Sequence, residues 1–289
     1  MATLEAHRMF YAELITSSVG MPKSRLTSAF MATPREHYLG PGPWKVFTAR
    51  GYIQTPSDDP AFLYQDIVVA LEDEQGINNG QPMLHALCLA ALNVMEGETI
   101  VHIGAGAGYY TAILAQLTGP GGDVSAYEIQ PVLAERAARC LANLPNVTVY
   151  QRSGAEASLP NCDAVYVSAG CTAPLQNWLD ALRPGGRLLV PLTPDGVGNM
   201  PGLGGMLLIT RVTEKQFDAR FISPVVIIPC VGARDQETAK RLAEAFKRGD
   251  SGKVRSLKLG TSPDETCWCS GNGWWLSTSE NTRRTALVS

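Results

Sequence analysis

Three glycines at alternate positions, Gly104, Gly106 and Gly108, form the segment with the clearest chemical meaning. An apolar run over 99–103 precedes them and a helical apolar pattern over 110–117 follows, which predicts a strand, a tight turn and a helix. Glycine permits positive φ and lets a ligand approach the main chain closely, and the helix N-terminus adds free N–H groups with partial positive charge. The segment therefore predicts a site where main-chain atoms bind a small ligand.

An acidic residue, Glu128, ends the next strand-like run, 123–128. Its ionised carboxylate has enough lone pairs to accept hydrogen bonds from both hydroxyls of a ribose. Dinucleotide-binding turns have the spacing G-x-G-x-x-G, whereas this chain has G-x-G-x-G. The two features favour a ligand with a single nucleoside over a dinucleotide. The alternatives are that the glycines only let strand pack on helix, and that Glu128 is a solvated charge at a strand end.

Strand-like and helix-like runs alternate through the middle of the chain. The strand-like runs are 99–103, 123–128, 147–150, 164–168, 187–191, 206–211 and 217–228, and the helix-like runs are 110–117, 131–144 and 174–182. This alternation predicts an α/β fold with a doubly wound, mostly parallel, seven-stranded sheet, whose ligand lies beyond the carboxyl ends of the strands. The last two strands have no helix between them and are expected to form an antiparallel hairpin at the edge.

The pattern divides the chain into three regions. Residues 1–95 form a helical N-terminal region, with a loop rich in Gly and Pro over 40–60 and a helix that opens at Pro82. Residues 96–232 form a Rossmann-like domain. Residues 233–289 form a C-terminal extension with one amphipathic helix over 237–247, followed by a stretch without clear periodicity.

Composition excludes several classes of function. The chain has 289 residues, 45% of them hydrophobic, with a net charge of −3, so no basic surface for nucleic acid is expected. No apolar segment is long enough to span a bilayer, and the mixed N-terminus does not resemble a signal peptide. Seven scattered cysteines favour reduced thiols and a cytoplasmic location. Cys267 and Cys269 lack a second pair of ligands, so no metal is expected, and the oligomeric state stays open.

Further motifs along the chain resemble those of a known protein family. The glycine spacing looks like motif I of the class I S-adenosylmethionine (SAM) methyltransferases, and the order of segments resembles the protein-L-isoaspartate O-methyltransferase family over residues 60–232. The segments that carry the resemblance are YQD at 64–66, GINNGQP at 76–82, HIGAGAGY at 102–109, YEI at 127–129, CDAVYVSAG at 162–170, LRPGGRLLVP at 182–191 and VIIPCVG at 226–232.

This resemblance implies a cofactor, an acceptor and a set of site residues. The cofactor would be SAM, and the methyl group would pass to a carboxylate of a protein or peptide. The alternative acceptor is a small metabolite or natural product, methylated on oxygen or nitrogen. The residues expected to bind the cofactor are His102, Gly104, Ala105, Gly106, Gly108, Tyr109, Glu128, Ile129, Ser153 and Gly154, and those expected at the reacting end are Asn79, Gly80 and His85.

The chain departs from the family pattern at three motifs, and its extension beyond Gly232 is not part of that pattern. Asn78-Asn79-Gly80 replaces a Thr-Ile-Ser run whose serine sits by the substrate, so no hydroxyl is present there. His102 replaces an acid, and Arg152-Ser153-Gly154 replaces Gly-Asp-Gly near the adenine. These changes permit a third hypothesis, a binding protein that has kept the fold and lost turnover.

The two histidines near the proposed site each have two interpretations. His102 is either a hydrogen-bonded core residue or an acceptor for the ammonium group of SAM, in which case binding would weaken as the imidazole protonates. His85 is either a base or a core or surface residue. A carboxylate acceptor, with a pKa near 4, is already ionised at neutral pH and needs no base, whereas an amine or hydroxyl would need one.

Overall fold

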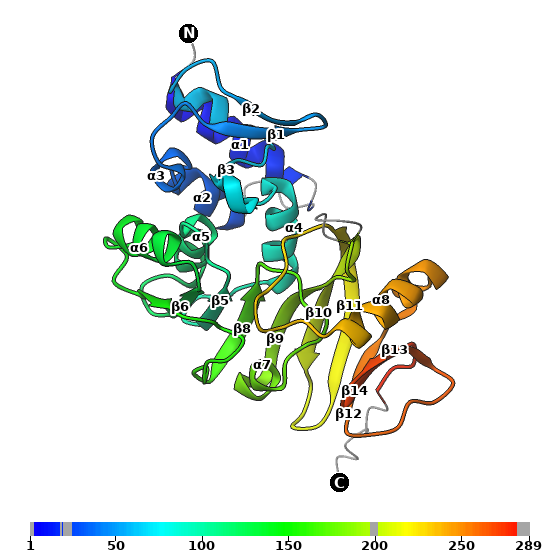
Figure 1. The fold of residues 1–289 in the computed structure, drawn as a ribbon. Helices are drawn as coiled ribbons and strands as arrows, with labels where there is room; N and C mark the ends of the chain where they lie inside the picture. Colours follow the sequence, from blue (N-terminus) through cyan, green and yellow to red (C-terminus); the bar gives the residue numbers. More distant parts are fainter. Residues whose placement is uncertain (1–2, 18, 20–24, 197–201, 282–289) are drawn as a thin grey trace.

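The structure, a computed structural model, describes residues 3–17, 19, 25–196 and 202–281. Its main element is one mixed sheet of ten strands in the order β13-β14-β12-β11-β10-β9-β8-β5-β6-β7 (Figure 1). The strands are β5 (Thr99–Ile103), β6 (Asp123–Glu128), β7 (Val147–Gln151), β8 (Cys162–Val167), β9 (Leu182–Leu192), β10 (Gly204–Arg211), β11 (Phe217–Val225), β12 (Ser256–Leu259), β13 (Cys267–Gly271) and β14 (Trp274–Ser277).

The strand directions follow the predicted alternation up to β9. Strands β7, β6, β5, β8 and β9 pair in parallel, and β10 is antiparallel to both of its neighbours, β9 and β11. The sheet has ten strands rather than the predicted seven, because β12, β14 and β13 continue it beyond β11. The β10–β11 hairpin is therefore inside the sheet and not at its edge. The C-terminal stretch lacked clear periodicity because its strands are short and contain adjacent buried tryptophans.

Helices cover both faces of the sheet, which matches the predicted doubly wound arrangement. Alternate residues of β5 separate the two cores, since successive side chains of a strand point to opposite faces. Ile100 packs in the core that includes residues of α1, α2, α4 and α5, whereas Val101 packs in the core that includes residues of α7 and α8. The helices are α1 (Leu4–Ser17), α2 (Arg25–Ala32), α3 (Glu36–Leu39), α4 (Pro82–Leu92), α5 (Tyr109–Thr118), α6 (Pro131–Cys140), α7 (Gln176–Ala181) and α8 (Gln236–Arg248).

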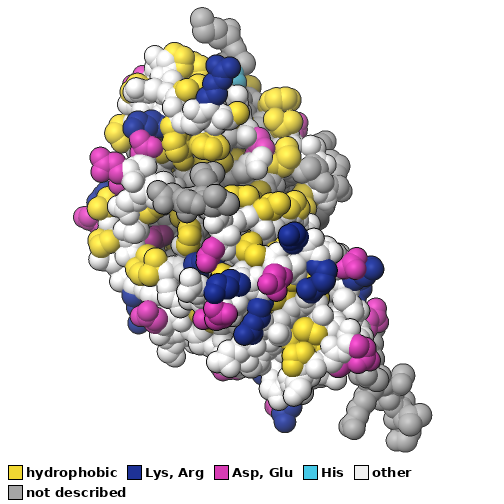
Figure 2. All heavy atoms as spheres, turned by 45° about the vertical axis from the view of Figure 1, so that its right-hand side comes forward, with side chains coloured by type: hydrophobic (Ala, Val, Ile, Leu, Met, Phe, Trp, Pro, Cys, Tyr) yellow, Lys and Arg dark blue, Asp and Glu magenta, His cyan; other side chains and the backbone are white. Residues whose placement is uncertain are grey.

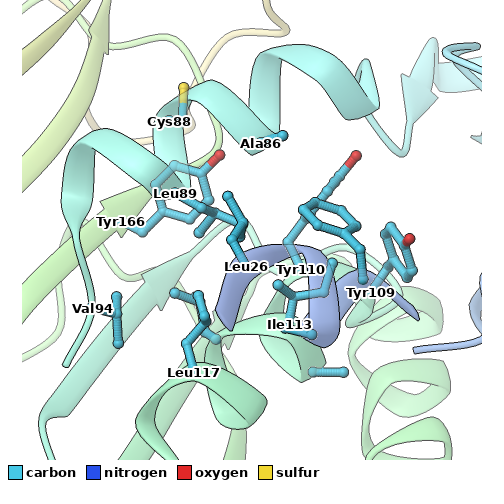
Figure 3. Close-up of a cluster of buried hydrophobic side chains, with 14 of the residues drawn as sticks. Leu26, Ala86, Cys88, Leu89, Val94, Tyr109, Tyr110, Ile113, Leu117 and Tyr166 are labelled. Carbon is cyan, nitrogen blue, oxygen red and sulfur yellow. The ribbon is translucent and has the colours of Figure 1, made fainter. Parts of the chain in front are cut away.

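The first core joins the N-terminal helices to the sheet. Figure 3 shows Tyr109, Tyr110 and Ile113 of α5 beside Leu26 of α2 and Leu89 of α4. Tyr166 of β8 lies in the same cluster, which places three tyrosines under the N-terminal region. This packing holds α4, and the loop before it, over the carboxyl ends of the strands.

The Gly- and Pro-rich segment 40–60 contains ordered strands that the sequence pattern missed. Strands β1 (Lys45–Thr48) and β2 (Gly51–Gln54) form an antiparallel hairpin, and β3 (Ala70–Glu72) pairs with β4 (Ile77–Asn78). Short 3₁₀ turns occupy Pro60–Leu63, Asp73–Gln75 and Ser251–Lys253. Along the chain, two short hairpins therefore lie between the N-terminal helices and α4, and Figure 1 shows them in blue and cyan.

The surface differs between the two ends of the molecule. On the face drawn in Figure 2, hydrophobic side chains gather over the upper half, while Lys and Arg interleave with Asp and Glu over the lower half. The β1–β2 hairpin contributes to the exposed hydrophobic set, with Phe47 50% and Ile53 56% exposed. Within the described ranges, none of the helices has both the length and the apolar character that crossing a membrane requires.

Candidate functional site

A cavity of about 1110 Å³ lies at the carboxyl ends of β5 and β6. Its volume exceeds that of most small-molecule pockets, which leaves room for a nucleoside and for part of a second reactant. Five segments supply most of its wall: 75–81 before α4, 103–107 in the glycine turn, 127–130 at the end of β6, 152–155 after β7, and 223–231 at and beyond the end of β11.

The glycine turn presents its main chain to this cavity. Gly104 and Gly106 line the wall with φ of +77° and +56°, a region that side chains strongly disfavour. The N–H groups of Gly104 and Ala105 donate to the carbonyl oxygen of Tyr127, at 2.9 and 3.1 Å. The predicted strand, turn and helix are present, and these bonds attach the turn to the end of β6.

Glu128 meets the glycine turn directly. Its Oε2 accepts from the N–H of Gly106 at 2.7 Å and its Oε1 accepts from the N–H of Gln130 at 2.9 Å. Burial raises the pKa of this carboxyl, and the bonds from the main chain oppose that rise. Each oxygen keeps lone-pair capacity for one further donor, so the buried carboxylate can accept a pair of hydroxyl groups from the cavity.

Ser153, Gly154, Tyr109 and Ile129, which were expected to bind the cofactor, also line the cavity, and their contact with the cofactor stays a prediction. Ser153 Oγ accepts from the N–H of Ala155 at 3.2 Å, so the hydroxyl hydrogen is available. A methyl group on Gly154 would stand 2.8 Å from Ile103 Cγ1, which explains the glycine. Tyr109 is buried, and its hydroxyl lies 3.3 Å from that of Tyr11.

His102 does not line the cavity. Its Nδ1 lies 2.8 Å from Thr111 Oγ1, and its Nε2 lies 3.0 Å from Ser168 Oγ. Burial lowers the pKa of the imidazole to about 3, so the ring is neutral across the ordinary pH range. Of the two interpretations, these contacts favour a hydrogen-bonded core residue, and a contact to SAM stays a prediction.

Gly108 is also outside the cavity wall, at the N-terminus of α5. Its φ is +94°, and a methyl group there would stand 2.7 Å from Leu141 Cδ1. The third glycine is therefore required for the packing of α5 against the segment that follows α6. Its direct contact with the cofactor stays a prediction.

The opposite end of the cavity brings Gly80 and His85 together. A methyl group on Gly80 would stand 2.2 Å from His85 Nε2, so the main chain of the loop lies against the edge of the ring. His85 Nδ1 shares a hydrogen bond with the Tyr166 hydroxyl at 2.6 Å, and burial lowers the pKa of His85 to about 3. A neutral imidazole with so low a pKa is a poor proton acceptor at neutral pH. The arrangement favours a role in holding the loop.

Asn79 is fixed beside Gly80 by Val69. Asn79 Oδ1 accepts from the N–H of Val69 at 2.8 Å, and the N–H of Asn79 donates to the carbonyl oxygen of Val69 at 2.9 Å. Asn79 Nδ2 and the hydroxyl of Tyr110 are both buried without a hydrogen-bond partner. Tyr110 was not among the predicted site residues, although it follows Tyr109 at the start of α5 and could have been found from its helix position.

Comparison with known proteins gives the same family from sequence and from structure. The sequence profile described as protein-L-isoaspartate(D-aspartate) O-methyltransferase matches residues 12–232. A protein-L-isoaspartate O-methyltransferase of Brucella anthropi is 33% identical over 178 residues, which are 59% of this chain and 76% of the relative. One of Methylorubrum populi is 32% identical over 177 residues, 60% of this chain and 78% of the relative.

Two solved structures share the fold. A protein-L-isoaspartate O-methyltransferase superposes with a TM-score of 0.63 at 21% identity, covering 83% of this chain and 69% of its own. A putative enzyme of the same name from Plasmodium falciparum, in complex with S-adenosyl-L-homocysteine, has a TM-score of 0.62 at 16% identity and covers 78% of this chain and 98% of its own. Because the profile covers most of the chain, the protein belongs to the protein-L-isoaspartate(D-aspartate) O-methyltransferase family of SAM-dependent methyltransferases.

Proposed function

We propose that this chain transfers the methyl group of SAM to the side-chain carboxylate of isoaspartyl residues in proteins or peptides. The observation that carries the proposal is the family profile over residues 12–232, which includes both ends of the cavity. The curated relatives are named for the same reaction. The alternative acceptor, a small metabolite or natural product, has no support of this kind.

The cofactor end of the cavity fits SAM. The main chain of Gly104, Ala105 and Gly106 would bind its amino-acid part, and Glu128 would accept from the two ribose hydroxyls. Ser153 and Gly154 would lie by the adenine, and Tyr109 and Ile129 would cover the nucleoside. When bound, SAM supplies a methyl group on a positively charged sulfur, which is a good leaving group.

The acceptor end of the cavity suits a group that is already ionised. A carboxylate, with a pKa of about 4, needs no proton removed at neutral pH, and the neutral His85 offers no base for an amine or a hydroxyl. The remaining task of the chain is to hold acceptor and donor in line at near-attack distance. Asn79 and Gly80, on the loop before α4, are proposed to position the acceptor.

The test is methyl transfer from labelled SAM to a short isoaspartyl peptide, with the aspartyl peptide of the same sequence as the matched control. We expect a base-labile methyl ester on the isoaspartyl peptide and a much slower reaction of the aspartyl peptide. Calorimetric titration with SAM and with S-adenosyl-L-homocysteine separates binding from turnover. Cofactor binding without any ester would remove the isoaspartyl acceptor and leave the small-molecule enzyme and the binding-protein hypothesis.

A protein or peptide acceptor and a cytoplasmic location complete the proposal. All seven cysteines are free thiols in the structure, which supports a reducing compartment.

A further inference from the structure

The acceptor end of the cavity contains polar atoms that lack partners. Within the described ranges, the buried side-chain nitrogen and oxygen atoms without a hydrogen bond are Asn79 Nδ2, Tyr110 OH and Arg35 Nε. Asn79 and Tyr110 both line the cavity. An unpaired buried polar atom destabilises the folded state, because it has lost its bonds to water without gaining others. Two such atoms in one wall indicate a place built for a ligand that can accept hydrogen bonds.

The free end of the Asn79 side chain is a donor. Its Oδ1 must be the atom that accepts from the N–H of Val69, so the unpaired atom is the NH₂ group, which can only donate. The oxygen and nitrogen of the Asn79 amide are assigned in this way because the N–H of Val69 can bond only to an acceptor. Asn79 is 8% exposed, so little of the side chain contacts solvent.

Tyr110 adds a second donor next to the same loop. Its ring stacks on His85 with centroids 3.6 Å apart and planes 5° from parallel, and His85 in turn lies against Gly80. Burial raises the pKa of the Tyr110 hydroxyl well above its ordinary value, so the hydroxyl keeps its proton. Asn79, Gly80, His85 and Tyr110 therefore form one continuous wall with two neutral donors.

A buried positive charge lies behind this wall. The guanidinium of Arg35 donates to the carbonyl oxygens of Leu63, Gln65 and Ile67, and among the described residues no carboxylate forms an ion pair with it. The charge lies 5.7 Å from the centre of the Tyr11 ring, whose hydroxyl meets that of Tyr109.

The opposing charge in this region is Asp66, which acts electrostatically on Tyr110. Its oxygens are occupied by Gln81 Nε2 at 2.7 Å and by the N–H of Met83 at 2.8 Å. Asp66 therefore anchors the start of α4, while Arg35 is left with neutral carbonyl partners. Hydrogen bonds from neutral groups leave the charge of Asp66 in place, but at the Tyr110 hydroxyl the electrostatic effect of Arg35 is the larger of the two, so the local potential favours an anion over a cation.

We propose that Asn79 Nδ2 and Tyr110 OH form a binding subsite for the acceptor carboxylate, with Arg35 making the potential behind it favourable to an anion. The subsite deepens the proposed function and rests on it for the identity of the acceptor. The two neutral donors bind some of the lone pairs of the carboxylate. No ion pair forms, so the negative charge of the carboxylate is not neutralised. A remaining lone pair stays free to attack the methyl group. Of the two groups only the Tyr110 hydroxyl could accept from a cationic amine, and the charge of Arg35 would repel that amine.

Two substitutions test the subsite with little change in shape. Asn79→Asp keeps the oxygen that accepts from Val69 and replaces the free NH₂ group by an oxygen. Tyr110→Phe removes only the hydroxyl and keeps the stack on His85. Asn161→Asp is the charge control, because it makes the same chemical change at an exposed residue outside the cavity wall. The measurements are kcat and KM with an isoaspartyl peptide, affinity for S-adenosyl-L-homocysteine, and melting temperature.

We expect Asn79→Asp to lower kcat/KM about 100-fold at pH 7.5 and Tyr110→Phe to lower it about 10-fold, mainly through KM, as expected for lost bonds to a charged group. Asn161→Asp should lower it less than threefold. Affinity for S-adenosyl-L-homocysteine should stay within twofold in all three. The loss in Asn79→Asp should shrink as pH falls, because a protonated Asp regains an O–H donor. Tyr110→Phe should melt at the same or a higher temperature, since it removes an unpaired buried group.

A peptide panel separates this proposal from the proposed function. With S-adenosyl-L-homocysteine bound, the wild-type chain is titrated with the isoaspartyl peptide, the aspartyl peptide and the peptide whose side-chain carboxylate is replaced by the amide. Preference for either carboxylate over the amide, lost in Asn79→Asp, supports the subsite even if no isoaspartyl ester forms and the proposed function fails. Equal binding of carboxylate and amide peptides, or full activity in both variants, overturns it.

Discussion

The two ends of the cavity differ in how their polar groups are satisfied. At the cofactor end, Glu128 already accepts from two main-chain N–H groups, and the glycine turn is bonded to Tyr127. At the acceptor end, Asn79 Nδ2 and Tyr110 OH are buried without partners. The polar groups of the cofactor end are hydrogen-bonded without a ligand, whereas the unpaired groups of the acceptor end destabilise the folded state until a ligand binds. Under the proposed assignment, the donor binds to groups that are already held by hydrogen bonds, and the unpaired groups are left for the acceptor.

Loss of the Glu128 carboxylate should have the largest effect on the cofactor end. Glu128→Ala removes both acceptors and leaves the N–H groups of Gly106 and Gln130 unpaired, so we expect SAM affinity to fall about 100-fold or more. Isothermal titration measures the change. Glu128→Gln keeps one acceptor oxygen and should lose less. An unchanged dissociation constant in Glu128→Ala would remove the assignment of this end to SAM.

A methyl group on Gly80 should damage the acceptor end selectively. Gly80→Ala places Cβ 2.2 Å from His85 Nε2 at a φ of +69°, so the loop must shift. We expect kcat/KM for the isoaspartyl peptide to fall about 100-fold, as a displacement of about 1 Å does elsewhere, while SAM affinity changes less than threefold. Gly76→Ala is the matched control, because its φ of +68° is similar and nothing lies within 4 Å of the added methyl. Equal damage by both substitutions would show that backbone strain alone accounts for the loss.

The pH dependence of SAM binding should come from Glu128. Burial raises its pKa, and ribose hydroxyls favour the ionised form, so affinity should be complete above that raised pKa and weaken as pH falls through it. His102 was expected to weaken binding on protonation, but its pKa of about 3 moves that effect to strong acid. Titrations over a pH series should show a transition shifted upward from the ordinary pKa of a glutamate. The dependence should flatten in Glu128→Gln, and a curve unaltered by that substitution would assign it to another group.

The raised pKa of Glu128 affects folding stability in the opposite direction from SAM affinity: as pH rises, affinity increases and stability decreases. An acid whose pKa is higher in the folded state favours folding most when both states are protonated, and that contribution is lost as pH rises through the folded-state pKa. Glu128 therefore costs some stability at neutral pH. Bound cofactor should offset this cost, so the rise in melting temperature on adding SAM should be greater at neutral pH than in acid.

Removal of the His85 imidazole should have the smallest effect on turnover. If His85 holds the loop and is not a base, His85→Gln should lower kcat less than tenfold and leave the dependence of kcat on pH unaltered between about pH 6 and pH 9. Loss of a general base typically costs 100-fold or more. A loss of that size, with cofactor affinity intact, would restore the catalytic interpretation of His85 and favour an acceptor that must be deprotonated.

Much of the cofactor end could be predicted from the chain. The strand, turn and helix around Gly104 are local features, and the carboxyl end of β6 lies beside that of β5 in any parallel sheet of this order, so Glu128 was expected next to the turn. The strands that the sequence pattern did not predict show the limit of such reasoning. The β1–β2 hairpin lies in a stretch rich in Gly and Pro, and β12–β14 are too short to show a period.

Local pattern was enough for the order of β5 to β9, the glycine turn and the acid beside it, because short-range sterics and alternating burial act on neighbouring residues. Packing over long sequence separations settled the rest. Asn79, Tyr110 and Arg35 come from three separate segments. Whether a buried donor forms a hydrogen bond depends on all the segments that surround it. His102 lies outside the cavity wall partly for the same reason: its Nε2 meets Ser168, 66 residues away, while its Nδ1 meets Thr111 in the helix that follows the glycine turn.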